Sequence, residues 1–313
     1  MLKDLPFGVE IEMTGLTREQ AAKAAAALWN TTPRHIGRSY DTWEVKDAEG
    51  RVWKFMNDGS IRAERWNRGE YAASSDSVYR VEMVTPKLEF SELPKLQEAV
   101  RAVRRAHAKV NDSCGLHVHI DASRFDNQSL KNLMSIMYSK EDLLFKALQV
   151  PESRVERWCK PVREGMLRQA RRMTADASRS RLERIWYQGE VNTAEHYNWT
   201  RYHALNLHSL FYRGTVEYRM FNSTLHAGRV KAYVHLALGI SSQALEQRGS
   251  QMRKTQTDNP AFTFRTWLLR MGMIGEEYKN TREHLLSSLP GNRAWRYDKD
   301  HYEKGNTGRE PER

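Results

Sequence analysis

The chain has few cysteines and no long apolar run, and these absences exclude several protein classes. Cys114 and Cys159 are the only cysteines among 313 residues, too few for a disulfide framework or a four-cysteine zinc site. No apolar run approaches the roughly 20 residues of a membrane-spanning helix, and the first residues lack the pattern of a signal peptide. We therefore expect a globular, cytoplasmic protein without a membrane partner.

Internal repeats and clean linkers are missing too, so the sequence offers no obvious division into domains. We expect one domain over residues 1–290, with an Arg-rich helical insertion at about 151–200. Residues 291–313 are polar and charged, and we expect a disordered tail there.

Positive charge is in excess. The chain has 50 lysines and arginines against 39 acidic residues, which gives a net charge of +11. Such a charge favours anionic partners, including nucleotides, nucleic acid and acidic substrates. Much of the excess lies in the Arg-rich stretch 154–184, which is either a solvated helical face or a groove for a polyanion.

Apolar periodicity indicates a mixture of strands and helices. Strands are expected at 7–13, 40–46, 51–57, 79–85, 114–121, 204–210 and 215–221, and helices at 17–29, 91–110, 127–148, 226–247, 262–271 and 275–288. Residues 62–77 are expected to form a loop. Two adjacent strand pairs, 40–57 and 204–221, are predicted to be hairpins. The pattern indicates an α+β fold with a largely antiparallel sheet.

The run 7–13 alternates apolar and acidic residues, which is typical of a strand. Glu10 and Glu12 then share one face, about 7 Å apart. Two carboxylates on one face repel each other, and a hard divalent cation relieves that repulsion because it prefers oxygen ligands. The alternative is an edge strand with a solvated acidic face.

Other predicted strands repeat this two-faced pattern. In 114–121, Leu116, Val118 and Ile120 face one side, and His117 and His119 face the other with Asp121. Imidazoles bind divalent metals or donate to phosphate, but two histidines in a strand are also compatible with a structural pair.

Two more strands and one turn contribute polar residues. Glu82 is a single acid in an apolar strand, and Glu217 shares a strand face with Arg219, where a guanidinium could stabilise a transferring phosphoryl group. Asp58 precedes Gly59 at a strand end. The alternatives are an acid–arginine pair in each strand and a turn-forming Asp-Gly. If these faces converge, they suit Mg²⁺ or Mn²⁺ bridging nucleotide phosphates.

Six motifs in a fixed order resemble the amidoligase family. They are GVEIE, DGS, VEMVTP, CGLHVHID, RYHALNL and TVEYRMFNSTL. The family belongs to the glutamine synthetase and glutamate–cysteine ligase superfamily of carboxylate–amine ligases, and the resemblance runs from about residue 6 to about residue 290. It implies an antiparallel sheet bent into a funnel, with helices packed outside and the site on the concave face.

The resemblance also implies roles for individual residues. The metal ligands matching the family are Glu10, Glu12, Glu82, His117 and Glu217. His119 matches a residue facing ATP, and Arg219 matches the arginine that contacts the transferring phosphate. Arg201 and Asn206 fall in a motif that contacts phosphate or substrate, and Asp58 is expected at the substrate amine or a metal.

The chemistry implied is ATP- and Mg²⁺-dependent amide formation through an acyl phosphate. The substrates would be a carboxylic acid and an amine, either of them free or carried on a peptide, a cell-wall fragment or a nucleic acid. Glu190 and Glu195 are candidates for deprotonating the amine. Two other hypotheses remain open from the sequence: a nucleic-acid-binding protein that uses the 154–184 stretch, and a metal-dependent phosphoryl hydrolase.

Overall fold

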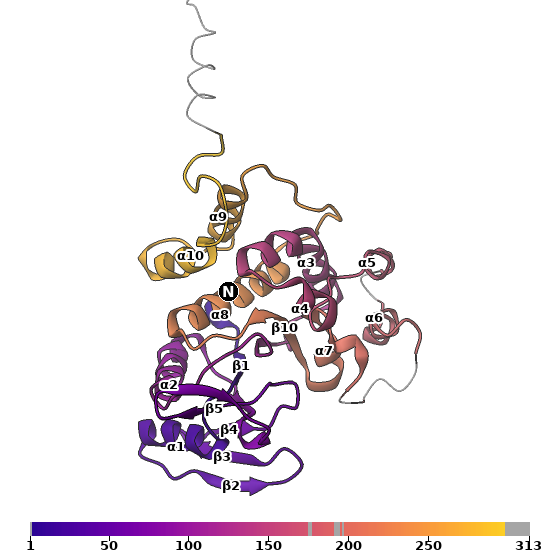
Figure 1. The fold of residues 1–313 in the computed structure, drawn as a ribbon. Helices are drawn as coiled ribbons and strands as arrows, with labels where there is room; N and C mark the ends of the chain where they lie inside the picture. Colours follow the sequence, from indigo (N-terminus) through magenta and orange to yellow (C-terminus); the bar gives the residue numbers. More distant parts are fainter. Residues whose placement is uncertain (1, 175–176, 191–194, 196, 298–313) are drawn as a thin grey trace, which may run out of the picture.

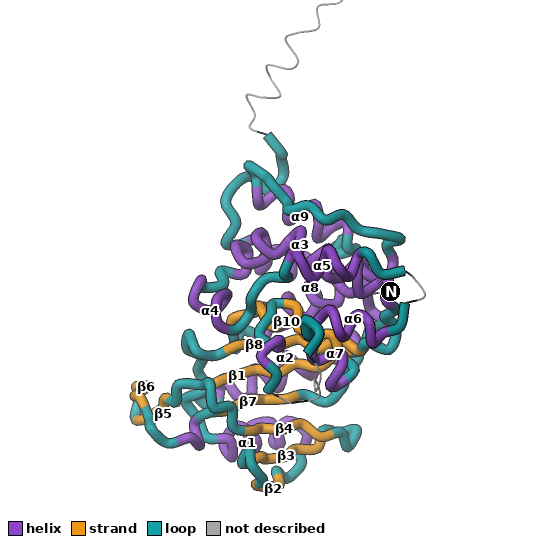
Figure 2. The backbone as a smooth tube through the Cα atoms, turned by 90° about the vertical axis from the view of Figure 1, so that its right-hand side faces the viewer, coloured by secondary structure: helices purple, strands orange, loops and turns teal. Residues whose placement is uncertain are grey.

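A computed structural model describes residues 2–174, 177–190, 195 and 197–297. Its centre is an eight-stranded sheet in the order β2-β3-β4-β7-β1-β8-β10-β9, and every neighbouring pair is antiparallel. Figure 2 shows the strands stacked in this order from β10 to β2. The strands are β1 Phe7–Met13, β2 Arg34–Gly37, β3 Thr42–Lys46, β4 Val52–Met56, β7 Val81–Val84, β8 Gly115–Asp121, β9 Leu205–Asn206 and β10 Thr215–Asn222. The predicted α+β class is confirmed.

Helices surround this sheet (Figure 1). The α-helices are α1 Arg18–Trp29, α2 Leu93–Arg105, α3 Asn127–Leu148, α4 Glu152–Arg157, α5 Glu164–Arg171, α6 Arg179–Trp186, α7 His208–Arg213, α8 Ala227–Glu246, α9 Pro260–Arg270 and α10 Lys279–Leu286. Short 3-10 helices lie at η1 Leu2–Asp4, η2 Ser77–Tyr79, η3 Phe90–Glu92, η4 Trp199–Arg201 and η5 Glu276–Tyr278. Three of the α-helices, α4 to α6, occupy the segment expected to be a helical insertion.

One face of the sheet is the core face. Ile11, Leu116 and Tyr218, from three adjacent strands, are each fully buried. Helix α1 packs on β3 and β4, α8 packs on β8, and α2 lies between α1 and α8. Burying one such aliphatic side chain contributes roughly 1.5–3 kcal/mol. Because side chains alternate along a strand, covering this face leaves the polar residues of the same strands on the other.

Helix α1 begins where the sequence predicts. Thr17 and Gln20 form a reciprocal capping box: the Thr17 hydroxyl accepts from the Gln20 amide at 3.2 Å, and the Gln20 side chain accepts from the Thr17 amide at 2.9 Å. Two donors that the first helical turn would otherwise leave without partners are thereby satisfied.

The structure corrects the predicted hairpin over 204–221. Residues 208–213 form helix α7, and only Leu205–Asn206 pair with β10. The Asn206 side-chain oxygen accepts from the His208 amide at 2.8 Å and turns the chain out of the sheet. Gly214, with φ of 73°, then ends the helix in the left-handed region that glycine adopts without strain.

Two further segments differ from expectation. Residues 62–77 contain a hairpin of β5 Glu64–Asn67 and β6 Glu70–Ala73, and β2 extends the main sheet. These strands are short and lack apolar alternation, so the sequence pattern misses them. Residues 291–297 carry no helix or strand, and the remainder of the predicted disordered tail, 298–313, lies outside the described residues.

Neither a membrane-spanning helix nor a disulfide is found among the described residues. Across the described ranges, no helix combines the length and apolar character needed to span a membrane. Cys114 and Cys159 are both buried and free, so they form no disulfide.

Candidate active site

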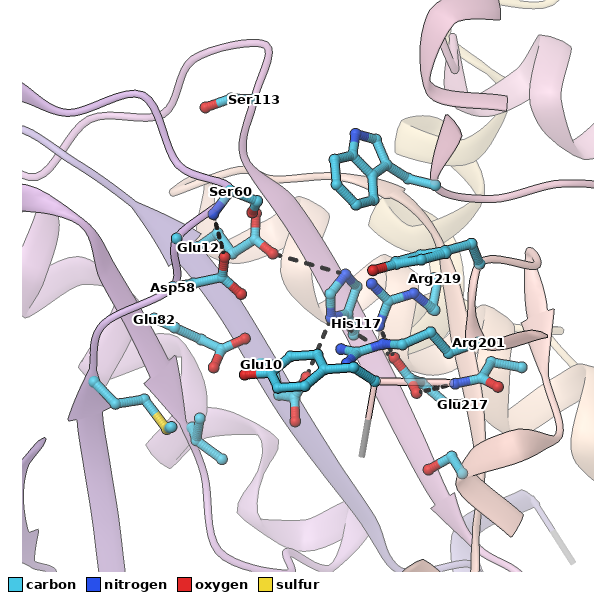
Figure 3. Close-up of a pocket in the computed structure, with 18 of the residues that line it drawn as sticks. Glu10, Glu12, Asp58, Ser60, Glu82, Ser113, His117, Arg201, Glu217 and Arg219 are labelled. Atoms are coloured by element: carbon cyan, nitrogen blue, oxygen red, sulfur yellow. Dashed lines mark hydrogen bonds and ion pairs between the residues drawn. The ribbon is translucent and has the colours of Figure 1, made fainter. Parts of the chain in front are cut away.

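The face of the sheet opposite the core helices lines a pocket of about 1010 Å³. Figure 3 shows acidic and basic side chains converging on it from several strands and loops. The predicted residues in its lining are Glu10, Glu12, Asp58, Glu82, His117, Arg201, Asn206, Glu217 and Arg219. His119 is outside this lining but touches its walls, as described below. The sheet therefore brings together residues that are up to 209 positions apart in the chain (10 to 219).

Strand register explains the convergence. Glu10 on β1 is directly opposite His117 on β8, and Glu12 is opposite Glu82 on β7. On the next strand pair, Glu217 is opposite His119. Directly opposed side chains in an antiparallel pair are about 5 Å apart and on the same face. Four adjacent strands thus place their polar residues in one continuous row.

Strand β10 contains a bulge at Arg219. Tyr218 pairs with Val118, but the next paired residues are Phe221 and Leu116, so β10 has an extra residue at this point. The Arg219 amide donates to the Ala204 carbonyl at 2.9 Å, which continues the pairing of β10 with the β9 side. Its guanidinium turns back and donates to Glu217 at 2.5 Å. Such bulges re-aim side chains and are common beside active sites.

The two histidines contact the carboxylates around them. His117 Nδ1 lies 3.1 Å from Glu10 Oε2 and 3.7 Å from Glu217 Oε1. His119 Nε2 lies 3.4 Å from Glu10 Oε1. That nitrogen is buried and makes no hydrogen bond to any described residue. A buried ring nitrogen that lies near two carboxylates without a hydrogen bond has the position of a candidate metal ligand.

Three groups of side chains have the spacing of metal ligands, with their ligand atoms all within 4.8 Å of one another. The groups are Glu10, Glu82 and His117; Glu10, His119 and Glu217; and Glu12, Asp58 and Glu82. Glu10 and Glu82 are each shared by two groups, so adjacent ions could share a bridging carboxylate. Carboxylate oxygens with one imidazole suit Mg²⁺ or Mn²⁺.

The crowding of buried acids in the pocket raises the pKa of two of them, Glu12 and Glu82. Burial, and then the neighbouring charge of Asp58, raise the pKa of Glu12 to about 8. Burial also raises the pKa of Glu82 well above its usual value, reinforced by Glu10 and Asp58. The charge of Arg219 offsets this rise only in part for both acids, and a bound cation would lower both pKa values.

For the other two acids, Glu10 and Glu217, nearby cationic groups outweigh the effect of burial on the pKa. Burial alone would raise the pKa of Glu10, but the charges of His119 and His117 outweigh it and lower the pKa well below the usual value. For Glu217, Arg219 and the two histidines overcome burial and hold the pKa near 2. The pocket therefore has a compensated side around Glu217 and an uncompensated acidic side around Glu12 and Glu82.

Asp58, Asn206 and Arg201 have different local roles. Asp58 accepts from the Ser60 amide at 2.7 Å, as the turn interpretation requires, and also belongs to a candidate ligand group. Asn206 donates to Glu217 Oε2 at 2.6 Å and so orients a candidate ligand. Arg201 lies on η4 at the pocket wall, with its guanidinium 5.5 Å from the centre of the Tyr197 ring.

The two suggested bases are not brought to the pocket. Glu190 and Glu195 are both exposed, and neither lines the cavity. The structure gives no support to either as the group that deprotonates an amine.

Four arginines of the pocket lining were not predicted, namely Arg62, Arg154, Arg157 and Arg213, and two of them have informative contacts. Arg213, expected in a hairpin turn, lies on α7 with Nη1 3.2 Å from Glu10 Oε1. Arg154 on α4 is 6% exposed, and its guanidinium donates to the Cys114 and Phe221 carbonyls, both at 3.3 Å. Gly115 leaves room for it, since a Cβ there would lie 2.9 Å from Arg154 Nη2. In the sequence, the only local indication of this buried arginine was the Cys114-Gly115 pair at the start of β8.

Comparison with known families agrees with this geometry. Residues 3–241 match the family model Amidoligase_2, described as "Putative amidoligase enzyme". The chain belongs to the amidoligase family. The match includes every strand of the main sheet and all the predicted site residues. Membership of the amidoligase family supports an enzyme that forms amide bonds. A comparison with curated proteins found no match.

Proposed function

We propose that this amidoligase is an ATP- and Mg²⁺-dependent carboxylate–amine ligase that works through an acyl phosphate. The observation that carries the proposal is the row of buried carboxylates and histidines beside a buried arginine in one pocket. Phosphoryl transfer needs charge neutralisation and positioning more than it needs a protein nucleophile. The pocket offers acids, imidazoles and guanidinium groups in that combination.

The residues present fit magnesium or manganese. Glu12, Asp58 and Glu82 would hold one ion, and Glu10 and Glu217 with the histidines would hold another. A bound divalent ion supplies charge neutralisation for phosphate oxygens. An ion on the Glu12 side would also offset the burial and the repulsion between acids that together raise the pKa of Glu82.

The protein side chains would position the reacting groups. Arg219, held by Glu217, and Arg201 on η4 would bind oxygens of the transferring phosphoryl group. The substrate carboxylate oxygen attacks the γ-phosphorus, and the bond to ADP breaks. The amine nitrogen then bonds to the acyl carbon, inorganic phosphate leaves, and the nitrogen loses a proton to give the amide.

Hydroxylamine provides a test that does not require knowing the amine, because it traps acyl phosphates as hydroxamates. A panel of carboxylic acids would be incubated with ATP, Mg²⁺ and hydroxylamine, and ADP and hydroxamate measured by mass spectrometry. We expect equal amounts of both products, only when acid and hydroxylamine are present together.

Two variants sharpen this test. Glu12→Gln should reduce hydroxamate formation by at least about 100-fold, comparable to losing one electrostatic stabiliser. Glu98→Gln, on α2 outside the pocket, should leave it unchanged. ADP formation that needs neither acid nor amine would indicate a hydrolase, and normal activity of Glu12→Gln would refute the assignment.

A further inference from the structure

A second cavity, of about 1150 Å³, lies between α5 and α6. Figure 1 shows these two helices at the right-hand edge of the molecule, beyond α3 and α7. Four arginines line the cavity, Arg163, Arg172, Arg181 and Arg184, together with glutamines and serines. Among the described residues, none of those that line it is acidic. We refer to this cavity as the α5–α6 groove.

The arginines of the groove differ in their partners from the other arginines of α5. Arg168 forms an ion pair with Glu164, and Arg171 donates to the Ser250 carbonyl. In contrast, Arg172 is exposed and its side chain has no ion pair or hydrogen bond to a described residue. The same holds for Arg181 and Arg184 within the described ranges. The groove therefore gathers three arginines that form no ion pair with a described residue, together with Arg163, which lies near the charge of Glu190.

Arg163 lines the groove and also contacts Trp199, which is not itself part of the groove lining. Its Nη2 donates to the Trp186 carbonyl at 3.2 Å, and its guanidinium is 5.6 Å from the centre of the Trp199 ring. The Nε atom is buried and has no partner among the described residues. Trp199 is 45% exposed and begins η4, whose last residue is Arg201 on the catalytic pocket wall. The groove and the pocket are thus linked through one short helix.

A concave surface with one sign of charge concentrates the electrostatic field and attracts counter-charged chains. An extended peptide is a poor occupant, because the walls are helices and offer no strand edge to pair with. An amphipathic helix is also a poor occupant, since only Met166 and Ile185 provide large apolar side chains. Guanidinium groups that track a backbone, next to an exposed aromatic ring, are the combination used for single-stranded nucleic acids.

We propose that the α5–α6 groove binds the phosphodiester backbone of a single-stranded nucleic acid, with Trp199, the exposed ring beside Arg163, stacking on a base. This interaction goes beyond the ligase reaction and does not depend on it. It accounts for a concentration of arginines that the active site does not use.

Fluorescence anisotropy with labelled oligo(dT) and oligo(U) of about 12 nucleotides, a length within known site sizes, tests the proposal. Binding is measured to the full chain in EDTA without ATP, so the ligase reaction cannot influence it. Each phosphate contact to a single strand contributes about −0.7 to the slope of log K against log salt, so four arginines predict a slope near −3. In ~0.1 M salt, one such contact is worth about 5-fold in affinity.

Charge-reversal variants distinguish binding in the groove from attraction to the general positive charge of the surface. Arg172→Glu with Arg184→Glu should weaken binding by at least about 25-fold and make the slope less negative by about 1.4, the share of two contacts. Arg104→Glu with Arg105→Glu, on exposed positions of α2, makes the same change in net charge and should alter binding little. Trp199→Ala should weaken binding without changing the slope.

Several results would overturn the proposal. These are an equal loss of affinity in both double variants, a slope shallower than about −1, or competition by poly-glutamate as strong as by oligo(dT) at equal charge. Melting curves verify that each variant is folded, and Arg172→Gln with Arg184→Gln provides a milder pair should the reversal disturb the fold. No binding to either oligonucleotide by the wild-type chain would likewise refute it.

Discussion

Replacing Glu12 with glutamine should stabilise the metal-free protein while it abolishes activity. Glu12 is 5% exposed, and burial together with Asp58 raises its pKa from 4.5 to about 8. An acid whose pKa is higher in the folded than in the unfolded state contributes stability at low pH, and the fold loses it as pH rises. From pH 4.5 to pH 8, this loss amounts to roughly 4 kcal/mol.

The glutamine variant keeps the local structure but removes the charge. Its side-chain oxygen can still accept from the Gly115 amide, which donates to Glu12 at 2.6 Å in the present structure. A gain of 4 kcal/mol in a chain of 313 residues corresponds to a melting temperature higher by roughly 6 °C. The gain should be present at about pH 8 and should disappear well below pH 4.5, where Glu12 is protonated in both states.

Differential scanning fluorimetry measures this directly, with EDTA and then with increasing Mg²⁺. Mg²⁺ should raise the melting temperature of the wild type at about pH 8 and have a much smaller effect on Glu12→Gln, which lacks a ligand. Glu98→Gln should behave like the wild type, since exposed pairs contribute little. A variant less stable than the wild type in EDTA at this pH, or equal stabilisation of both by Mg²⁺, would refute the reasoning.

Three other substitutions give further predictions. Arg219→Lys should lower hydroxamate formation by about 100-fold or more, because a lysine cannot reproduce the guanidinium fork; activity within a few-fold of wild type would argue against the phosphate role. Gly115→Ala should cost about 1–3 kcal/mol in urea unfolding by displacing Arg154, whereas Gly165→Ala, with open space around it, should be neutral or stabilising. Burial raises the pKa of Glu141 to about 7, so the contribution of this group to stability falls as pH rises from 4.5 to above 7. Glu141→Gln should lack about 3 kcal/mol of that fall in thermal melts between these pH values, and parallel curves for both proteins would contradict it.

Local patterns predicted the elements that carry the site. In β1 and β8, alternation of apolar and polar residues identified both the strands and the faces of Glu10, Glu12, His117 and His119, because the side-chain period of a strand is two. The ordered motifs pointed to the amidoligase family, which the family comparison confirmed. The α+β class followed from the same patterns.

Segments whose structure depends on distant contacts were missed. Helix α7 replaces a predicted strand because Asn206 and Gly214 set its ends, and β5–β6 forms without apolar alternation. The bases suggested in the insertion, Glu190 and Glu195, do not reach the pocket. Such outcomes depend on loops, where local propensity is weak and tertiary contacts decide.

The amino-acid sequence by itself determined which residues share a strand face, because that property is local to a few neighbouring positions. It could not specify how four strands align with one another. Only the tertiary structure decided that Glu10 faces His117, that Glu12 faces Glu82, and that the pairing of β10 with β8 shifts by one residue beside Arg219. Register and bulges arise from packing and hydrogen bonding between strands far apart in the chain.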